Sequence, residues 1–591
     1  MKELYFTFSN NTRKAITPVF LVDDIECAPA AVELLNRNRL VGTFFVPCET
    51  KGNLAELFSG HEVALLQNGR SEARKQRIVL EKKLNRPVFG RCDCAASQND
   101  DDRQASVDNS GFAYALSLSF DNPECRFPQR NLLTWTPLAS IQSVPDSTLD
   151  AYENESWGGT VRAMILTAKT GDLRKDAALL DAKLARMSRI RGCAHLPLAA
   201  LQAQFLAFQT LRTTVDRTIV ENLSASTIAA NYGNDHGAAP DTVRVSISPG
   251  TRLRLPAETL LSSDSQPDGV EVLELKENQI FRPTFPNHLW KAVTFSYDDG
   301  APEDDPLLEI LNRHHFKGSF NLNTDRFPKQ PVAGRLSLQD LPKRYAGHEV
   351  TVHGCGHETW NAVTPAAVLE DVLRCRKELE SVFNRPIVGS AYPCGEHSKS
   401  KTVDTILTAC GIVYDRIINN KELFALPTDF LAWGATSHHN GRNGMSLCEL
   451  GQKFLDERPT SPILFYAWGH SFEFPRLNNW NVMEEFCSLL EPHPEIWRAT
   501  NLELHDYIRA VRNLFWFKDS PLPLDGDNRL LYGFGEQPSQ RVDPFSVGFA
   551  GTRDGTCIVN QSAIPVYGFL NERPIVLRPV DPISALHLDL P

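Results

Sequence analysis

The sequence lacks a long apolar run, a run of basic residues and a C-x-x-C pair. No stretch approaches the roughly 20 apolar residues of a membrane-spanning helix, so we expect no membrane association. The net charge is −11 and the pI about 5.9, and there is no basic patch, so we expect no nucleic-acid partner. The amino-terminal segment MKELYFTFSNNTRK has no apolar core of the signal-peptide type. These absences predict a soluble cytoplasmic protein, with non-classical export left open.

The cysteines do not form a disulfide framework. There are 13 of them, an odd number scattered along the chain, and the closest pair is Cys92 and Cys94. This pattern favours reduced thiols in a reducing compartment. With 591 residues, 42% of them hydrophobic, the chain can bury several cores, and its length predicts roughly three to four domains.

One stretch at residues 291–300 combines a predicted buried strand with two acids, and it reads KAVTFSYDDG. Asp298 and Asp299 end the apolar run, and Gly300 allows the chain to turn, so both carboxylates can reach one site. An acid pair at the carboxyl end of a buried strand suits a metal ligand beside a general base. The alternative is a strand end with two solvated aspartates.

Two histidines follow the next polar strand end, in VTVHGCGHETW. His353 and His357 are four residues apart, so both can bind one metal if the segment turns helically. A histidine pair alone is often a surface coincidence, but the upstream acid pair favours a site. Two histidines, one carboxylate and a position left for water form the ligand set of a catalytic zinc.

Two further strand ends carry candidate groups. In IVGSAYPCG, Pro393 starts a turn that would direct the backbone N–H of Cys394 into the site, although an ordinary proline turn is equally consistent. In ILFYAWGHSFEF, His470 ends an apolar strand and could donate a proton near neutral pH. A structural histidine in the core is the alternative.

The second half alternates predicted strands and helices. The strand-like segments are KAVTFSY, KGSFNLN, EVTVHG, IVGSAYP, GIVYDRI and PILFYAWGH. Strict alternation predicts parallel strands joined by crossover helices. Roughly seven or eight such units would close a barrel whose active site lies at the carboxyl ends of the strands.

The first half repeats segments of the second. Asp23 and Asp24 end an apolar run as Asp298 and Asp299 do, GHEVAL at 60–65 matches GHEVTV at 347–352, and NRPVFG at 85–90 matches NRPIVG at 384–389. The three matches keep their order, which predicts a duplication. A β-rich segment follows each predicted barrel, and prolines near 283–288 mark the boundary.

We therefore predict an α/β protein with two distorted (β/α) barrels, each followed by a small β-rich module. The predicted domains are a degenerate barrel at 1–215, a β-rich module at 216–285, a catalytic barrel at 286–515 and a second β-rich module at 516–591.

The motifs VTFSYDDG, HGCGH, AYPCG and WGHSFEF follow one another as in the polysaccharide deacetylases, the NodB-homology family or carbohydrate esterase family 4, which the second half resembles over about 290–515. The resemblance implies a distorted (β/α) barrel. It also implies that Asp298 is the general base, that the metal ligands are Asp299, His353 and His357, and that His470 is the acid. The N–H of Cys394 would then stabilise the oxyanion, and the cofactor would be a divalent metal, most often Zn²⁺, with Co²⁺, Mn²⁺, Ni²⁺ or Fe²⁺ possible.

The sequence departs from the family pattern at several positions. Gly354 stands where Ser or Thr is frequent, and Ala391 replaces the arginine that usually orients the base. The fourth motif has three candidates, Asp415, Asp429 and Trp433, and the nearby His438 and His439 either face the site or lie in a solvated loop. As substrate contacts we expect Trp360, Tyr392, Trp433 and Trp468.

The first half is expected to keep the fold and to lose the catalytic groups. His353 aligns with Leu66, His357 with Arg70 and Pro393 with Cys94, and His470 aligns near Thr170. Leucine cannot bind a metal, and arginine places a positive charge where the cation would lie. We expect the two barrels to pack as an internal pseudo-dimer, and homo-oligomers stay possible.

The sequence thus predicts a metal-dependent deacetylase that acts on N-acetylated carbohydrate. Two alternatives stay open: an O-acetyl esterase on acetylated glycans, and a carbohydrate-binding pseudoenzyme. The second is less favoured because the residues of the predicted site are intact in the second half.

Overall fold

The structure is a computed structural model of the chain. It describes residues 3–8, 12–67, 73–93, 112–116, 134–135, 138–154, 161–234, 241–263, 266–419, 423–518, 543–553, 555–581 and 584. The predicted counterparts Arg70 and Cys94 lie outside these residues.

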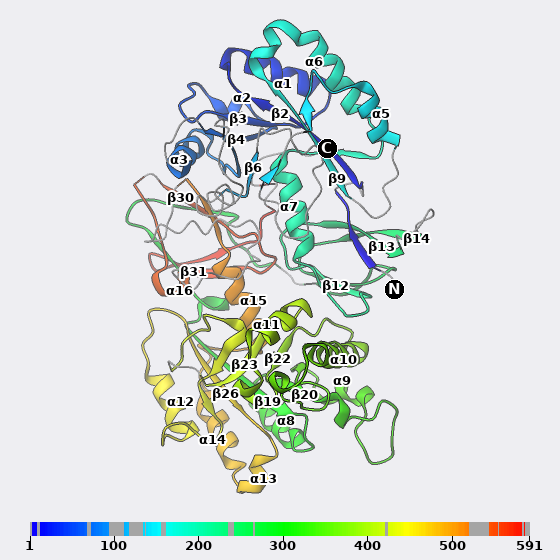
Figure 1. Cartoon of the computed structure of the whole chain (residues 1–591). Coiled ribbons are helices and arrows are strands. Elements are labelled where there is room, and N and C mark those ends of the chain that lie inside the picture. The colour runs from blue at the N-terminus through cyan, green and yellow to red at the C-terminus, as the bar shows by residue number, and fades with distance from the viewer. Residues whose placement is uncertain are drawn as a thin grey trace.

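The second half folds around a curled parallel sheet whose strands run in the order β24-β23-β22-β21-β20-β19-β26-β25, with β27 paired to β19 (Figure 1). The strands are β19 (Lys291–Asp299), β20 (Ser319–Leu322), β21 (Glu349–Val352), β22 (Gly389–Ala391), β23 (Tyr414–Asn419), β24 (Trp433–Ala435), β25 (Ser437–His438), β26 (Ile463–Gly469) and β27 (Ile496–Arg498). The helices are α8 (Asp304–Arg313), α9 (Leu341–Arg344), α10 (Pro365–Phe383), α11 (Lys401–Ala409), α12 (Leu447–Asp456), α13 (Glu473–Leu477), α14 (Asn481–Leu490) and α15 (Asn501–Arg512). Parallel strands with intervening helices confirm the α/β prediction.

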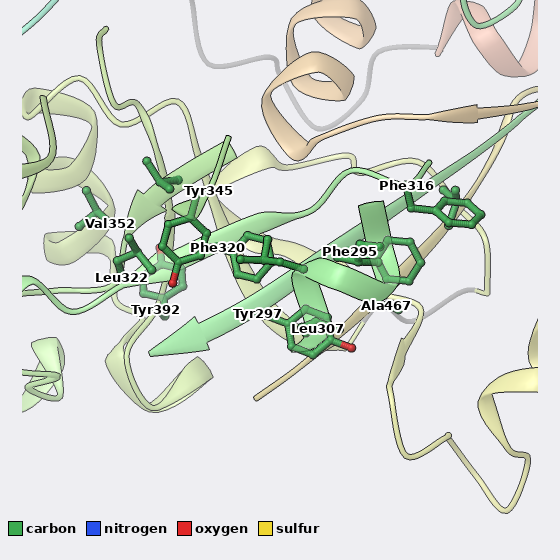
Figure 2. Close-up of a cluster of buried hydrophobic side chains, with 14 of the residues drawn as sticks. Phe295, Tyr297, Leu307, Phe316, Phe320, Leu322, Tyr345, Val352, Tyr392 and Ala467 are labelled. Carbon is green, nitrogen blue, oxygen red and sulfur yellow. The ribbon is translucent and has the colours of Figure 1, made fainter. Parts of the chain in front are cut away.

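Strand β19 lies at the centre of this sheet and is buried along its whole length. Aromatic side chains from β19 and β20 stack on each other: the rings of Tyr297 and Phe320 are 6.3 Å apart (Figure 2). Phe295 packs edge-on against Phe316 and against Phe486 of α14. The strand ends in the two carboxylates Asp298 and Asp299.

The first half contains a second curled parallel sheet with the same strand order, β7-β6-β5-β4-β3-β2-β9-β8, and β10 paired to β2. Its strands are β2 (Lys14–Leu21), β3 (Thr43–Val46), β4 (Glu62–Gln67), β5 (Gly90–Asp93), β6 (Tyr114–Leu116), β7 (Thr134–Trp135), β8 (Ala139–Ser140), β9 (Arg162–Lys169) and β10 (Cys193–His195). Its helices are α1 (Ala28–Arg37), α2 (Leu54–Leu57), α3 (Ala73–Leu84), α5 (Asp146–Asn154), α6 (Leu173–Ser188) and α7 (Leu198–Gln209). The two sheets fit two barrels of the predicted type.

The buried glutamate of the repeated GHEV segment makes the same contacts in both halves. Glu62 accepts hydrogen bonds from Thr43, Tyr114 and the N–H of Ala199. Glu349 accepts hydrogen bonds from Ser319, Tyr414 and the N–H of Leu502. Burial raises the pKa of both carboxyls. This pair of networks explains why the segment recurs: each glutamate ties its own strand to two other strands of the same sheet and to the start of a helix, α7 or α15.

The β-rich segments lie between the two barrels (Figure 1). Their strands are β1 (Glu3–Phe6), β11 (Arg212–Thr213), β12 (Ile219–Glu221), β13 (Ile228–Asn234), β14 (Asp241–Ile247), β15 (Thr251–Arg254), β16 (Thr259–Ser263), β17 (Val272–Leu275), β18 (Ile280–Pro283), β28 (Phe515–Phe517), β29 (Phe549–Ala550), β30 (Thr556–Val559), β31 (Val566–Leu570) and β32 (Arg573–Leu577), with the short helix α16 (Pro544–Val547).

The strand pairs of these segments cross the predicted domain boundaries. Strand β1 pairs with β13, whereas β17 pairs with β30, and β18 pairs with β29 and β31. Segments predicted to end the first β-rich module thus belong to sheets of the second. The predicted residue ranges stay a prediction, but these sheets join chain segments on both sides of the seam near residue 285.

Each β-rich segment contacts the barrel of the other half. After the first barrel, the N–H of Val215 donates to Glu380 of α10, 2.6 Å away. After the second barrel, the N–H of Lys518 donates to Glu81 of α3, 2.8 Å away. Glu81 and Glu380 also accept equivalent bonds, from the N–H groups of Val88 and Ile387. The two contacts are therefore reciprocal.

The two β-rich segments meet across a local two-fold arrangement. Asn222 and Asn560 begin matched N-x-S-A turns, and each side chain holds its own turn. The N–H of Ala225 donates to the carbonyl of Gln561, and the N–H of Ala563 donates to that of Leu223. Among the described helices, none is long and apolar enough to cross a membrane.

Candidate metal centre and active site

The carboxyl end of β19 presents the predicted acid pair. Asp298 and Asp299 are 3% and 6% exposed, so both carboxylates are largely removed from bulk water. Asp299 has a positive φ of 81° and Gly300 one of 70°. A non-glycine residue in this conformation is strained, and such strain is often found at functional sites. The turn brings two neighbouring carboxylates to one side of the sheet.

The two predicted histidine ligands join Asp299. His353 directly follows β21, and its Nε2 lies 3.6 Å from Oδ1 of Asp299. The Nε2 of His357 lies 3.6 Å from the same oxygen. His357 also has a positive φ, of 64°. The three side chains thus converge as the sequence predicted.

The hydrogen bonds around this triad fit a bound cation. Nδ1 of His353 lies 2.8 Å from the carbonyl oxygen of Ala391, so it carries the proton and Nε2 presents its lone pair. In the described part of the chain, neither this Nε2 nor Oδ1 of Asp299 has a hydrogen-bond partner. Burial lowers the pKa of His353, against the opposing effect of the two aspartates, and so favours the neutral imidazole that binds metals.

Asp298 is held by two polar side chains. The side-chain N–H of Asn321, on the adjacent β20, donates to its Oδ1 at 2.7 Å. Arg416 forms a salt bridge with its Oδ2, and both side chains are buried. Burial alone would raise the pKa of Asp298, but Arg416, His353, His470 and the Asn321 hydrogen bond outweigh it and lower the pKa. The carboxylate is therefore ionised and can accept a proton.

Arg416 was not identified from the sequence. It lies on β23 and pairs with Ala391 of β22. Ala391 is the residue that stands where the family pattern has an arginine. The guanidinium of Arg416 stacks on the indole of Trp468 at 4.4 Å. The signal was a single arginine inside the apolar segment GIVYDRII, because a buried arginine on a strand requires a carboxylate partner.

His470 follows β26 and faces Asp298, with 4.0 Å between its Nε2 and Oδ2 of the aspartate. Its Nδ1 lies 3.1 Å from Oε1 of Glu473, at the start of α13. Burial would lower the pKa of His470, but Glu473 and Asp298 raise it overall. Glu473, a second residue missed by sequence reasoning, therefore favours a protonated His470. Its spacing of three residues from His470 on the following helix was the available signal.

Cys394 begins a short 3₁₀ turn with a positive φ of 61°. Its side chain is exposed, and its Sγ lies 3.8 Å from Nδ1 of His357. Within the part of the chain that the structure describes, its backbone N–H donates no hydrogen bond. This N–H is thus available for an external acceptor, as the sequence analysis expected.

The predicted aromatic substrate contacts are mostly core residues. Trp360, Tyr392 and Trp433 are at most 1% exposed. The indole of Trp360 donates to Asp371, and the Tyr392 hydroxyl donates to Asp404, so both bind the scaffold (Figure 2 shows Tyr392 within the apolar cluster). Their burial does not support contact with a substrate. Trp468 is 9% exposed and supports Arg416.

The fourth-motif candidates have structural contacts. Asp415 is buried and bonded to the hydroxyl of Ser390, and burial raises its pKa well above its usual value. Asp429 caps a turn by accepting from the N–H of Leu431. His438 and His439 instead face Glu473. The two histidines therefore lie next to the site, behind His470, and not in a solvated loop.

The sheet register identifies the first-half counterparts of the site. Val19 pairs with Thr43 as Ser296 pairs with Ser319. Continuing along these strands gives the counterparts of the five residues Asp298, Asp299, His353, Arg416 and His470 as Leu21, Val22, Leu66, Leu116 and Lys169. None of the four apolar side chains can bind a metal or carry a proton.

This register corrects the alignment of Asp23 and Asp24 with Asp298 and Asp299. Asp23 and Asp24 lie two residues beyond Leu21 and Val22, which occupy the strand positions of Asp298 and Asp299. An alignment by sequence letters alone did not take the strand pairing into account. Asp23 accepts from the N–H of Gly171 at 2.9 Å, and Asp24 forms a salt bridge with Arg174. These carboxylates are therefore occupied by local partners.

Comparison with known proteins finds a family match in the second half. Residues 287–414 match the polysaccharide deacetylase family. The predicted resemblance of the second half is confirmed. The matched segment includes Asp298, Asp299, His353, His357 and Cys394, whereas Arg416, His470 and Glu473 lie beyond it. No curated protein matches the chain.

Solved structures of polysaccharide deacetylases align with part of the chain. A protein from Mycobacterium smegmatis described as a polysaccharide deacetylase is 18% identical, with 40% of this chain and 96% of that chain covered and a TM-score of 0.29. A family 4 acetyl xylan esterase from Clostridium thermocellum, in complex with a cobalt ion, is 12% identical, with coverage of 36% and 90% and a TM-score of 0.27. The catalytic domain of a peptidoglycan N-acetylglucosamine deacetylase from Eubacterium rectale is 15% identical, with coverage of 37% and 92% and a TM-score of 0.25.

Proposed function

We propose that the second half is a metal-dependent hydrolase that removes acetyl groups from N-acetylated carbohydrate. The observation that carries the proposal is the convergence of Asp299, His353 and His357 beside a second, ionised carboxylate, Asp298. The match of residues 287–414 to the polysaccharide deacetylases supports the substrate class.

Asp299, His353 and His357 would hold the cation. Two histidines, one carboxylate and a free position suit Zn²⁺, which is the metal we propose. When bound, such a cation lowers the pKa of a water ligand and polarises a carbonyl oxygen. The unpartnered Oδ1 of Asp299 and Nε2 of His353 support this assignment.

Asp298 is proposed to act as the general base. It takes a proton from the water that attacks the acetyl carbon, and the salt bridge from Arg416 keeps it ionised and oriented. The N–H of Cys394 is free to donate to the carbonyl oxygen as negative charge develops there.

His470 is proposed to act as the general acid. Its Nδ1 is bonded to Glu473, so the proton on Nε2 faces the site and can pass to the nitrogen as the C–N bond breaks. The products are acetate and a free amine on the sugar. An oxygen leaving group needs the same proton, which is why an O-acetyl esterase stays the second candidate.

The first half is proposed to be catalytically silent and to be a degenerate copy. The common strand order and the matched Glu62 and Glu349 networks support duplication. The apolar residues Leu21, Val22, Leu66 and Leu116 at the site positions support silence. The reciprocal contacts of Glu81 and Glu380 support an internal pseudo-dimer in which each half stabilises the other.

The test is acetate release from chitooligosaccharides and from acetylxylan by the zinc-loaded chain, with His353→Gln as the metal-site variant. We expect release from the amide substrate, lost in the variant. Release from acetylxylan alone would favour the esterase, and zinc binding without release from either substrate would favour a binding role.

A further inference from the structure

A second group of metal-binding side chains lies behind His470. His438 ends β25, His439 follows it, and Glu473 begins α13. Nε2 of His438 lies 3.0 Å from Oε2 of Glu473, and Nε2 of His439 lies 3.1 Å from the same oxygen. One carboxylate oxygen thus faces two imidazole nitrogens.

This arrangement repeats that of the first centre. There, Oδ1 of Asp299 lies 3.6 Å from the Nε2 atoms of both His353 and His357. Bond lengths of about 2.0–2.1 Å to a tetrahedral zinc place neighbouring ligand atoms about 3.3 Å apart. Both groups lie close to this separation.

His439 supplies an independent indication of a missing partner. Its side chain is completely buried between the rings of Tyr297 and Phe474, 5.8 Å and 4.2 Å away. Within the described chain, neither ring nitrogen forms a hydrogen bond, and neither does Oε2 of Glu473. The contact between His439 and Glu473 is short but off the direction of an N–H···O bond. Leaving such groups buried and unpaired destabilises the fold, so a bound partner is expected there.

The backbone is shaped around this histidine. A Cβ at Gly469 would lie 1.9 Å from Nδ1 of His439, so only glycine leaves room for the ring at that position. The ring is therefore fixed from three sides: by Gly469, Tyr297 and Phe474. A preformed, rigid ligand is what a specific metal site requires.

His438 has one contact that a cation would change. Its Nδ1 accepts a hydrogen bond from the N–H of Asn440, 3.2 Å away, in an exposed turn. Metal binding at Nε2 moves the ring proton to Nδ1 and breaks this bond. The loss is small because the Asn440 N–H is exposed and can donate to water instead.

The geometry points to a second divalent-cation site, formed by Nε2 of His438, Nε2 of His439 and Oε2 of Glu473. Two imidazoles and a carboxylate select Zn²⁺, or Co²⁺ as its spectroscopic substitute. Oε1 of Glu473 stays with His470, so the cation would fix the glutamate that orients the proposed acid. The first-half counterparts Ser140, Ile141 and Asp172 do not form such a set.

The inference goes beyond the proposed function, because binding of this cation does not depend on the reaction. The experiment is metal counting by mass spectrometry on the full chain after saturation with Co²⁺ and removal of the excess. We expect two ions per chain in the unmodified protein, one in His438→Gln, one in His353→Gln, and none in the double variant. The visible spectrum of bound Co²⁺ should lose a different component in each single variant.

His438→Gln carries the test because this side chain is 23% exposed and its replacement should not disturb the core. Glu473→Gln, which preserves the shape, should also reduce the count to one. His493→Gln is the matched control: its Nδ1 contacts Glu495 at 2.7 Å, without a second histidine, so the count should stay at two.

The proposal is overturned if the unmodified chain binds one ion, or if His438→Gln and Glu473→Gln keep the full count. The outcome is separable from the proposed function. If His353→Gln binds no ion, the proposal of the first centre is supported and that of the second is contradicted. If His353→Gln binds as many ions as the unmodified chain, only the proposal of the first centre is contradicted.

Discussion

The guanidinium of Arg416 and the carboxylate of Asp298 form a salt bridge in which the side chains are 2% and 4% exposed. The two residues come from different strands, 118 positions apart. Arg416 is the largest of the groups that lower the pKa of this buried carboxyl and keep it ionised. The bridge places an arginine beside Asp298, although Ala391 stands where the family pattern has its arginine.

Replacing Arg416 should weaken Asp298 as a base. In Arg416→Met, burial is no longer opposed by the guanidinium, so the pKa of Asp298 rises and the acid limb of the kcat/KM profile moves to higher pH. We expect about 10²-fold lower activity near neutral pH. Arg498→Met is the control, because that arginine also stacks on a ring, Phe316, but lies outside the site. An unchanged pH profile would separate Arg416 from catalysis.

The salt bridge between Arg212 and Asp506, which joins the two halves, should contribute to stability. Arg212 follows the first barrel and forms a salt bridge with Asp506 of α15, with side chains 9% and 14% exposed. Arg212→Met removes the arginine partner of the buried Asp506 carboxylate and leaves it only the contact with His505, which should cost about 3–5 kcal/mol and lower the Tm. Arg313→Met, in an exposed pair with Glu484, should change stability by about 1 kcal/mol or less. Equal effects of the two variants on the Tm would contradict the role of this contact.

The isolated fragment 283–591 should fold poorly. It lacks β17, which pairs with β30, and it lacks Val215, whose N–H donates to the carboxylate of Glu380. Both losses expose groups that the full chain buries, while the proposed metal ligands stay present. Limited proteolysis and circular dichroism measure the result. A fragment as protease-resistant and as active as the full chain would show that the first half is dispensable.

Restoring histidines in the first half should not create a metal site. In the double variant Leu66→His, Arg70→His, the acid pair of this half, Asp23 and Asp24, stays two residues out of register, and Asp24 stays bonded to Arg174. The metal count per chain should equal that of the unmodified protein. An additional bound ion would contradict the register-based alignment.

Asp304 should make the stability of the second half depend on pH. Burial raises its pKa to about 6, against hydrogen bonds from Ser471 and Tyr345. The folded chain then binds the proton more tightly than the unfolded chain, so its free energy of unfolding falls as pH rises from about 4 to about 6. A shift of about two units corresponds to about 3 kcal/mol.

Asp304→Asn removes the titrating group and keeps a similar shape. The difference in denaturation midpoint between the unmodified chain and this variant, measured at pH 4.5 and pH 7, should therefore shrink or reverse at the higher pH. Other titrating groups contribute equally to both proteins and cancel. A constant difference would mean that Asp304 does not titrate in this range.

The sequence predicted those parts of the molecule that local pattern determines. Alternating strands and helices predicted the parallel sheets, and the strand-end motifs predicted that Asp298, Asp299, His353, His357 and His470 would lie close together, as they do. These side chains are adjacent to strand ends, and the carboxyl ends of parallel strands meet at one edge. Spacing along the chain was therefore enough.

The parts that the sequence did not predict depend on pairing between distant segments. Arg416 reaches Asp298 because β23 and β19 belong to one sheet, and β17 pairs with β30 across almost half the chain. The register error at Asp23 has the same origin. Trp360 and Tyr392 were assigned to substrate by residue type, although burial is decided by tertiary packing.

The most direct test of the account is Asp298→Asn, with acetate release and metal content measured on the same preparation. Asparagine keeps the shape but cannot accept the proton, so we expect the metal count to be unchanged and acetate release from an N-acetylated oligosaccharide to fall by about 10²–10⁴-fold. A variant that keeps its metal and releases acetate at the rate of the unmodified chain would contradict the account.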